Sequence, residues 1–277
     1  MNIIEILKAI LFGIVEGITE WLPISSTGHL ILLDELVHMN MEERFMNMFN
    51  VVIQLGAIFA VIILFWKKLW PFGYEKKVLI KKDIFSMWFK VVVASIPSII
   101  IGIPFSDKFD ELFYNYVSVA IALFVFGILF IIVENHQKGR HAKICSIAEI
   151  TYSTAFIIGI WQLLAAVFPG TSRSGATIVG ALLLGVSRTV AAEFTFFLAI
   201  PAMLGVSFLK ILKFGFVFTS AELIILLTGT IVSFLVSIFV IRFLMGYIKK
   251  HNFKIFGWYR IVLAIIVMGY FLVTTLF

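Results

Sequence analysis

The sequence predicts an all-α protein that crosses a membrane several times. Hydrophobic residues make up 61% of the 277 residues and charged residues only 14%, and the mean hydropathy is +1.08. Long apolar runs recur along the whole chain, and the charged residues gather in short segments between them. Because no polar stretch is long enough for a soluble domain, we expect a single integral membrane domain over residues 1–277.

Six apolar runs are long enough for a helix to cross the hydrocarbon core of a bilayer. Two further apolar regions, 3–38 and 149–186, are interrupted by Pro, Gly and small polar residues. Irregular backbone at membrane depth is tolerated only where protein or a wet cavity surrounds it. Each interrupted region is therefore predicted to be a re-entrant pair of helices, which gives about ten helices in all. The full spans are expected over residues 49–66, 85–104, 116–134, 189–209, 219–241 and 255–275.

The basic loops predict the orientation of these spans. Lys and Arg concentrate in loops 67–82, 135–148 and 242–254, which alternating crossings place on one side, and the positive-inside rule assigns that side to the cytoplasm. The net acidic loop 105–115 and the turn 210–218 then lie outside, although the turn carries two lysines. The same alternation places both termini outside. The first re-entrant pair then enters from the outer face and the second from the inner face.

The two halves of the chain, roughly 1–145 and 146–277, show signs of an internal repeat. At an offset of 146 residues, Ser26 aligns with Ser172, and each half has one interrupted region and three spans. Because three is odd, the second half is predicted to be inverted relative to the first, as in many transporters. The alternative is that membrane helices resemble each other by composition alone.

The first interrupted region carries two carboxylates that a membrane segment would normally exclude. Glu16 and Glu20 are spaced i, i+4 and so project from one face of a helix. Two such carboxylates repel unless one holds a proton or a cation lies between them. Since Mg²⁺ and Ca²⁺ prefer carboxylate and phosphate oxygens, we expect a divalent cation at this pair. The alternative is an interfacial pair that faces water.

Hydroxyl groups and a histidine follow at the break between the two half-helices. Ser25 or Thr27 can cap the second half-helix, whose free N–H groups favour an anion. Ser26 is the favoured nucleophile, or else it orients a water, and His29 is the candidate proton donor or acceptor. Capping alone does not account for His29 beside two glutamates.

The second interruption, "PGTSRSGAT" at 169–177, places Arg173 among hydroxyl groups. A guanidinium at a helix start is suited to binding a phosphate bidentately. The alternative is that Arg173 pairs with a structural carboxylate. The hydroxyl groups expected to bind phosphate oxygens, across both interruptions, are those of Ser25, Thr27, Ser172, Ser174 and Thr177.

Other polar residues give weaker signals. Gln54 and Glu193 lie inside predicted spans and are expected to face the interior, where they support the site or bond between helices. Arg188 and Arg260 lie near span ends, where we expect them to snorkel towards water. The single cysteine, Cys145, excludes an internal disulfide and a multi-cysteine metal site. The net charge of +6 does not indicate nucleic-acid binding, because most basic residues lie in short loops.

Two stretches, "EGITEWLPISSTGH" and "PGTSRSGAT", resemble the signature regions of the undecaprenyl pyrophosphate phosphatase family, the bacitracin-resistance proteins. The resemblance extends through "FNVVIQLGAIFAV", "GVSRTVAAEFTFFLAIP" and "YRIVLA" and covers nearly the whole chain. It implies hydrolysis of undecaprenyl pyrophosphate to the monophosphate and inorganic phosphate, which recycles the lipid carrier for peptidoglycan synthesis. It also implies resistance to bacitracin, which competes for the substrate. Further implications are dependence on a divalent metal, an inverted-repeat fold, a homodimer, and a site on the outer face of the bacterial inner membrane.

The competing functional class is a transporter or flippase for prenyl phosphates, which the inverted repeat favours. The hydroxyl, histidine and glutamate cluster favours hydrolysis, because transport needs neither a nucleophile nor a proton donor. A purely structural scaffold has no use for two buried carboxylates facing an arginine. The lipid phosphatases of the acid-phosphatase superfamily fit poorly, because the chain contains no Arg-Pro pair. Under the hydrolase hypothesis Arg173 binds phosphate, Glu16 and Glu20 hold the metal, and His29 exchanges protons with Ser26 or a water.

Overall fold

The structure is a computed structural model that describes residues 3–73 and 80–276. The described residues are helical and form no β-strand. The first six α-helices are α1 (Ile3–Thr19), α2 (Ser26–Leu36), α3 (Glu43–Val52), α4 (Gln54–Leu64), α5 (Trp66–Leu69) and α6 (Lys82–Pro97). The others are α7 (Ser106–Phe113), α8 (Tyr116–Gln137), α9 (Tyr152–Val167), α10 (Arg173–Leu183), α11 (Arg188–Phe214), α12 (Ser220–Tyr247) and α13 (Lys254–Leu276). A π-helical turn, η1 (Ser98–Gly102), extends α6, and a 3₁₀ turn, η2 (Ile147–Glu149), precedes α9.

Six helical segments are long and apolar enough to cross a membrane, and they match the six predicted spans. They are Glu43–Leu64, Lys82–Gly102, Tyr116–Gln137, Arg188–Phe214, Ser220–Tyr247 and Lys254–Thr274. The first comprises α3 and α4, which meet at Ile53 in helical conformation. The protein is therefore a multi-pass membrane protein, and its regular structure over residues 3–73 and 80–276 is helical. The short helices α5 and α7 are the α-helices that the sequence did not predict.

The helices pack closely where one of them carries a glycine. A Cβ atom on Gly56 of α4 would lie 2.0 Å from the Thr230 carbonyl oxygen of α12. Likewise, a Cβ atom on Gly159 of α9 would lie 2.1 Å from the Ala94 carbonyl oxygen of α6. Without a hydrophobic effect between helices in lipid, such close backbone approach is a main source of helix association.

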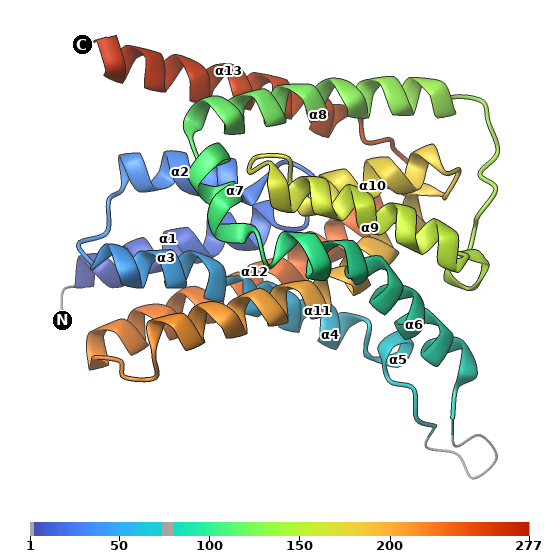
Figure 1. Cartoon of the computed structure of the whole chain (residues 1–277), viewed down its shortest axis with the longest axis horizontal. Helices are drawn as coiled ribbons and strands as arrows, with labels where there is room; N and C mark the ends of the chain where they lie inside the picture. The colour runs from blue at the N-terminus through green and yellow to red at the C-terminus, as the bar shows by residue number, and fades with distance from the viewer. Residues whose placement is uncertain (1–2, 74–79, 277) are drawn as a thin grey trace.

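Each interrupted region forms two helices joined by a break in the interior of the bundle. The first break lies between Thr19 and Ser26 and the second between Val167 and Arg173, at the predicted interruptions. Figure 1 shows α1 and α2 running back along each other from the end where the chain starts, and α9 and α10 doing so from the opposite end. The two breaks therefore approach each other inside the molecule.

The two helices that leave the breaks begin in the same way. The Ser25 hydroxyl, before α2, accepts a hydrogen bond from the Gly28 N–H, and the Ser172 hydroxyl, before α10, accepts one from Gly175 N–H. Both serines have positive φ, 75° and 66°. Ser25 and Ser172 therefore occupy the same position relative to the helix that follows. The sequence offset of 146 residues instead aligns Ser172 with Ser26, the first residue of α2.

The segments predicted to share one side lie at one end of the bundle. In Figure 1, α5, the start of α6 and the connection between α8 and α9 lie on the right, whereas α7 and the turn between α11 and α12 lie on the left. The expected snorkelling was wrong for Arg260, whereas Arg188 keeps 36% of its side chain exposed. Arg188 pairs with the buried Glu134, Nη2 to Oε2 at 2.5 Å, and Arg260 is fully buried.

Candidate functional site

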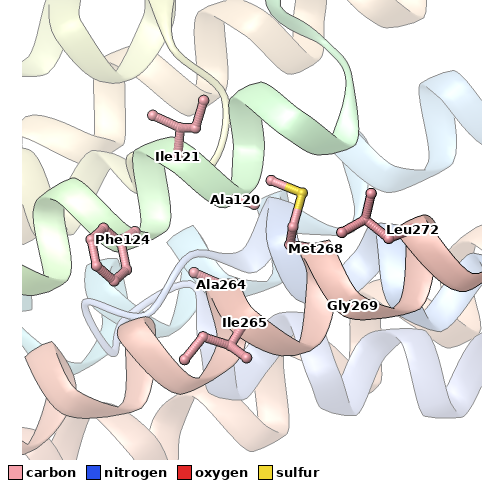
Figure 2. A pocket seen from close by; sticks show the side chains of 8 residues that line it. All are labelled: Ala120, Ile121, Phe124, Ala264, Ile265, Met268, Gly269 and Leu272. Atoms are coloured by element: carbon pink, nitrogen blue, oxygen red, sulfur yellow. The ribbon is translucent and has the colours of Figure 1, made fainter.

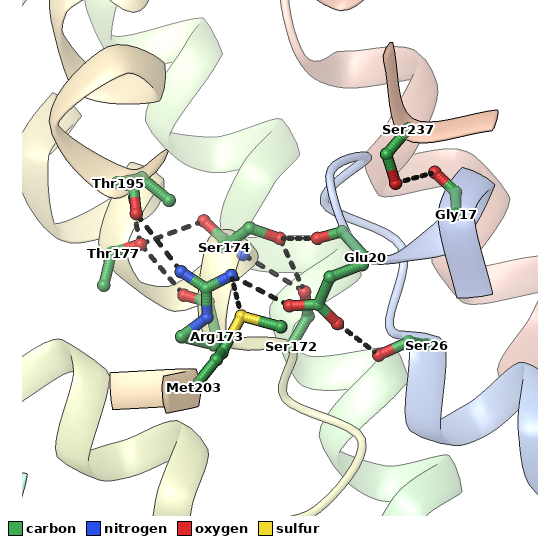
Figure 3. Close-up of polar contacts among 11 residues, drawn as sticks. Gly17, Glu20, Ser26, Ser172, Arg173, Ser174, Thr177, Thr195, Met203 and Ser237 are labelled. Carbon is green, nitrogen blue, oxygen red and sulfur yellow. Dashed lines mark hydrogen bonds and ion pairs between the residues drawn. The ribbon is translucent and has the colours of Figure 1, made fainter. Parts of the chain in front are cut away.

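The Glu20 carboxylate connects the two breaks. Its Oε1 accepts a hydrogen bond from Arg173 Nη2 at 2.8 Å, and its Oε2 accepts one from Ser26 Oγ at 2.8 Å (Figure 3). Only 9% of the Glu20 side chain and 15% of the Arg173 side chain are exposed. The two clusters that the sequence predicted separately therefore form one buried polar site.

The Arg173 guanidinium is fixed by further contacts with α11. Its Nη1 donates to the Thr195 carbonyl oxygen at 3.1 Å, and its Nη2 contacts Met203 Sδ at 3.4 Å (Figure 3). The centre of the guanidinium lies 5.8 Å from the Trp21 ring, within range of a cation–π contact. The carboxylate pairing that was the alternative to phosphate binding does occur, with Glu20. An anionic ligand would share or displace that contact.

The hydroxyl groups around Arg173 divide into two sets. Those of Ser172 and Ser174 lie 3.1 Å apart, and Ser174 Oγ donates to the Glu20 carbonyl oxygen at 3.2 Å. The Thr177 hydroxyl is buried, donates to the Arg173 carbonyl oxygen at 2.9 Å and bonds the Thr195 hydroxyl at 2.8 Å. The hydroxyl of Thr177 therefore supports the first turn of α10. Of the two serines, Ser172 is half-buried and Ser174 is buried.

At the first break the predicted phosphate ligands are also unequal. Ser25 is buried and its hydroxyl caps α2. Ser26 and Thr27 are half-buried at the start of that helix. Ser26 and Thr27 are thus better placed than Ser25 to contact a ligand.

Glu16 lies one helical turn before Glu20 and is fully buried. Neither of its oxygens accepts a hydrogen bond from a donor in the described part of the chain. The Glu16 carboxylate lies near enough to Glu20 and Arg173 to interact with both. A buried carboxylate without donors is costly, so it must keep a proton or meet a cation.

The two carboxylates are suited to bind a divalent cation whose remaining ligands are oxygens from other sources. Within residues 3–73 and 80–276, no group of three or more His, Cys, Asp or Glu side chains is arranged so that it could hold a metal ion. Mg²⁺ is often held by only one or two carboxylates together with substrate phosphates and waters. Glu16 and Glu20 suit that kind of site, and they do not suit a cage built by protein alone.

His29 is close to the break but has other partners than Ser26. Its Nδ1 lies 2.7 Å from the Ser25 carbonyl oxygen, so Nδ1 carries the proton, and its Nε2 accepts a hydrogen bond from the Tyr259 hydroxyl at 2.7 Å. The two rings stack with centroids 5.6 Å apart. The Ser26 hydroxyl donates to Glu20 instead, which makes Glu20 the nearest base.

Gln54 and Glu193 do not join the hydrogen bonds described for the two breaks. Glu193 is buried on α11 and forms an ion pair with Lys68 of α5. Gln54 is half-buried at the start of α4. The contacts of Glu193 therefore fit the interpretation that it links two helices better than the interpretation that it binds substrate directly.

Several residues of the site were missed by sequence reasoning. Thr195 and Met203 lie in a long apolar run without a signal of their own. Trp21, which is fully buried against Phe196, lies inside the first quoted stretch, directly after Glu20. Tyr259 belongs to the "YRIVLA" stretch, and its aromatic polar side chain next to an arginine could have drawn attention.

An apolar groove of about 440 Å³ runs between α8 and α13 (Figure 2). The two helices also enclose the start of α2, since a Cβ atom on Gly28 would lie 3.2 Å from Leu123 and 3.7 Å from Leu263. The groove therefore lies on the same two helices that support the helix of Ser26 and His29. It is lined by Ala120, Ile121, Phe124, Ala264, Ile265, Met268, Gly269 and Leu272.

A multi-pass helical protein with a buried site of carboxylates, hydroxyls and a guanidinium belongs to the class that acts on anionic lipids in the membrane. Residues 9–266 match the family of the bacitracin resistance protein BacA, and the chain belongs to that family. It is 63% identical over 276 residues to the undecaprenyl-diphosphatase of Desulfitobacterium hafniense, covering 100% of this chain and 99% of the relative. It is 63% identical over 273 residues to undecaprenyl-diphosphatase 1 of Clostridium acetobutylicum, covering 99% and 100%. Identity to the undecaprenyl-diphosphatase of Enterococcus faecalis is 60% over 270 residues, covering 97% and 98%.

Proposed function

We propose that this protein is a membrane hydrolase that converts undecaprenyl pyrophosphate to undecaprenyl phosphate and inorganic phosphate. The observation that carries the proposal is the Arg173–Glu20–Ser26 arrangement, which places an anion-binding group, a base and a hydroxyl together. Full-length relatives named undecaprenyl-diphosphatase support the substrate. The activity would recycle the lipid carrier for cell-wall synthesis and give resistance to bacitracin, which competes for the same lipid.

The chemistry follows from the hydrogen bonds of the site. Glu20 takes the proton of the Ser26 hydroxyl, and the Ser26 oxygen, or a water that it orients, attacks the terminal phosphorus. The bond from that phosphorus to the bridging oxygen breaks, and the lipid monophosphate leaves. If Ser26 itself attacks, water then hydrolyses its phosphate ester. Arg173 spreads positive charge over the phosphoryl oxygens, and Ser172, Ser174 and Thr27 donate to them. His29 supplies a proton to the leaving oxygen from its doubly protonated form, in which Nε2 also carries a proton and no longer accepts from Tyr259, directly or through water.

Glu16 and Glu20 would hold the divalent cation, Mg²⁺ or Ca²⁺. When bound, such a cation neutralises charge on the phosphate oxygens, which is its usual contribution to phosphoryl transfer. Glu16 is the stronger candidate ligand, because its two oxygens accept no hydrogen bond from the described donors. Glu20 divides its oxygens between Arg173 and Ser26.

The proposal includes an inverted repeat within one membrane domain, with halves of roughly 1–145 and 146–277. The equal caps at Ser25 and Ser172 support the repeat, and the opposite entry of the two helix pairs supports the inversion (Figure 1). The basic loops support an active site that opens outward from the bacterial inner membrane. We assign the groove of Figure 2 to an apolar chain, of the substrate or of a membrane lipid. The proposal extends to a homodimer, as the family resemblance implies.

The second candidate function is a transporter or flippase for prenyl phosphates. The observation that favours it is the pair of broken helices that meet from opposite ends, since this plan is common among transporters. The two functions differ in whether phosphate is released.

The decisive experiment measures phosphate release from a C55 or C15 prenyl pyrophosphate by the purified protein, with and without EDTA. We expect release with Mg²⁺ or Ca²⁺, loss of release with EDTA, and loss in Ser26→Ala. Ser146→Ala, in the loop before α9, is the matched control and should keep full activity. Absence of release under every metal condition would favour the transporter.

A further inference from the structure

Arg260 of α13 is fully buried and contacts both breaks at once. Its Nη1 donates to the Pro23 carbonyl oxygen at 3.2 Å. Its Nη2 donates to the carbonyl oxygens of Gly170 at 3.0 Å and Thr171 at 2.6 Å. One side chain thus joins segments that lie far apart in the sequence.

The three carbonyls belong to the backbone that leaves helical geometry. Pro23 lies between α1 and α2, and Gly170 and Thr171 lie between α9 and α10. A buried carbonyl without a donor destabilises the fold, most of all in a membrane. The planar fork of a guanidinium can serve two loops together, whereas an ammonium group presents all its donors from one point.

The neighbouring helices leave room for this guanidinium. A Cβ atom on Gly175, in the first turn of α10, would lie 2.7 Å from Arg260 Nη1. A Cβ atom on Gly127 of α8 would lie 3.3 Å from Arg260 Cβ. The Phe126 ring lies 5.7 Å from the guanidinium centre and contributes a cation–π contact.

Arg260 has no carboxylate partner among residues 3–73 and 80–276. Its Nε also lacks an acceptor in that part of the chain. Arg188, by contrast, pairs with Glu134. A buried cation balanced only by backbone carbonyls and one aromatic ring is costly, and a role in packing alone would be served as well by an apolar side chain.

The contacts of Arg260 lie next to the reacting groups. Thr171 precedes Ser172 and Arg173, and Pro23 precedes the loop to Ser26. The Ser172 backbone, with φ of 66°, is unfavourable for a residue with a side chain and persists only where surrounding contacts hold it.

We propose that Arg260 is a positioning residue that sets the distance and orientation between Ser26 on one break and Arg173 on the other. It acts through the backbone of the two loops and does not touch the substrate. This inference rests on the proposed phosphatase function for its kinetic test, and a second measurement makes it independent of that function.

The kinetic test compares Arg260→Lys and Arg260→Met with the matched pair Arg188→Lys and Arg188→Met. We expect the Arg260 variants to lose about 100-fold in kcat, because misplacement by about 1 Å has that effect, with KM changed less than about threefold. Lysine should not rescue the rate, whereas guanidinium ion should partly restore it in Arg260→Ala. The Arg188 variants should have a lower melting temperature and near-normal kcat. A kcat of Arg260→Lys within about threefold of the unchanged protein would overturn the inference.

The second measurement is a distance between spin labels on Leu22→Cys and Phe168→Cys in a Cys145→Ser background, one label beside each break. When Arg260 is unchanged, with or without Arg188→Met, we expect one narrow distribution of distances between the labels. In Arg260→Met and Arg260→Lys we expect a broad distribution. A narrow distribution in both Arg260 variants would refute the positioning role. If the unchanged protein releases no phosphate but the distributions broaden as expected, the proposed function fails and the positioning role stands.

Discussion

The Glu20 carboxylate accepts hydrogen bonds from Arg173 at one break and from Ser26 at the other. Substitutions of single residues in this arrangement should therefore test how the site works. Its oxygens are divided between Arg173 and Ser26, and its neighbour Glu16 has no described donor. The sequence predicted these residues because charged and hydroxyl side chains are rare in apolar runs. It could not predict that Glu20 would bond Ser26 while His29 bonds Tyr259, because those choices depend on short distances between separate helices.

At this scale we predict that Arg173→Lys is nearly as damaging as Arg173→Ala. Lysine keeps the charge but cannot bond Glu20, the Thr195 carbonyl oxygen and a phosphate from one planar group. The expected loss is about 2.7–4 kcal/mol of barrier, by analogy with a lost oxyanion donor. Phosphate release measured at saturating substrate is the test, with the exposed Arg140→Lys as control. Recovery of most of the rate by lysine would show that only the charge matters.

The carboxylates give a second prediction, which concerns the metal. Glu16→Gln should move the half-point of Mg²⁺ or Ca²⁺ activation to higher concentration, because it removes a ligand. Glu20→Gln should shift the half-point as well and lower the maximal rate further, since Glu20 also accepts the Ser26 proton. The test is the rate of phosphate release measured over a range of metal concentrations. The control variant is Glu222→Gln, because the Glu222 carboxylate only caps α12. An unchanged half-point in Glu16→Gln with a lower maximum would identify that carboxylate as a base.

At the scale of helices, the breaks are defined by how α2 and α10 begin. Proline and small polar residues indicated where the chain would leave helical geometry, and the structure has both breaks there. Ser25 was one of the two predicted caps and is confirmed, whereas the cap at Ser172 and the positive φ of both serines were not predicted, because nothing in the sequence indicates that conformation. The neighbouring Gly170 would have been the more natural residue for that conformation, and it has positive φ as well.

The caps predict an order of stability among substitutions at Ser172. Asn should be tolerated best, because it caps helices and accepts left-handed backbone. Gly loses the hydroxyl but suits the φ of 66°, and Ala loses both, so Ala should be the least stable by about 1–2 kcal/mol relative to Gly. Thermal unfolding in detergent measures the order. Thr151, which caps α9 with a φ of −83°, is the matched control, and its Ala–Gly difference should be smaller. Equal differences at both positions would show that backbone strain at Ser172 is unimportant.

At the scale of the whole molecule, the six spans were the easiest feature to predict, because length and hydropathy alone set them. The meeting of the two breaks was only suggested by the repeat. It depends on contacts between residues about 150 positions apart, such as Arg173 with Glu20, which no local pattern encodes. Arg260 shows the same limit, since its position near a span end predicted snorkelling, whereas the tertiary fold buries it.

The last prediction concerns the orientation of the whole molecule. The basic loops assign the connection between α8 and α9 to the cytoplasm, and α7 with the segment before α3 to the outside. An impermeant thiol reagent applied to intact cells should therefore label Lys108→Cys and Glu42→Cys, both exposed, in a Cys145→Ser background. The native Cys145, which is exposed in the loop before η2, should be labelled only after lysis. Lys77→Cys, outside the described residues, should behave like Cys145 because it belongs to the Lys-rich loop. Labelling of Cys145 in intact cells would reverse the topology, and the first break, with Glu20 and Ser26, would then enter from the cytoplasmic face.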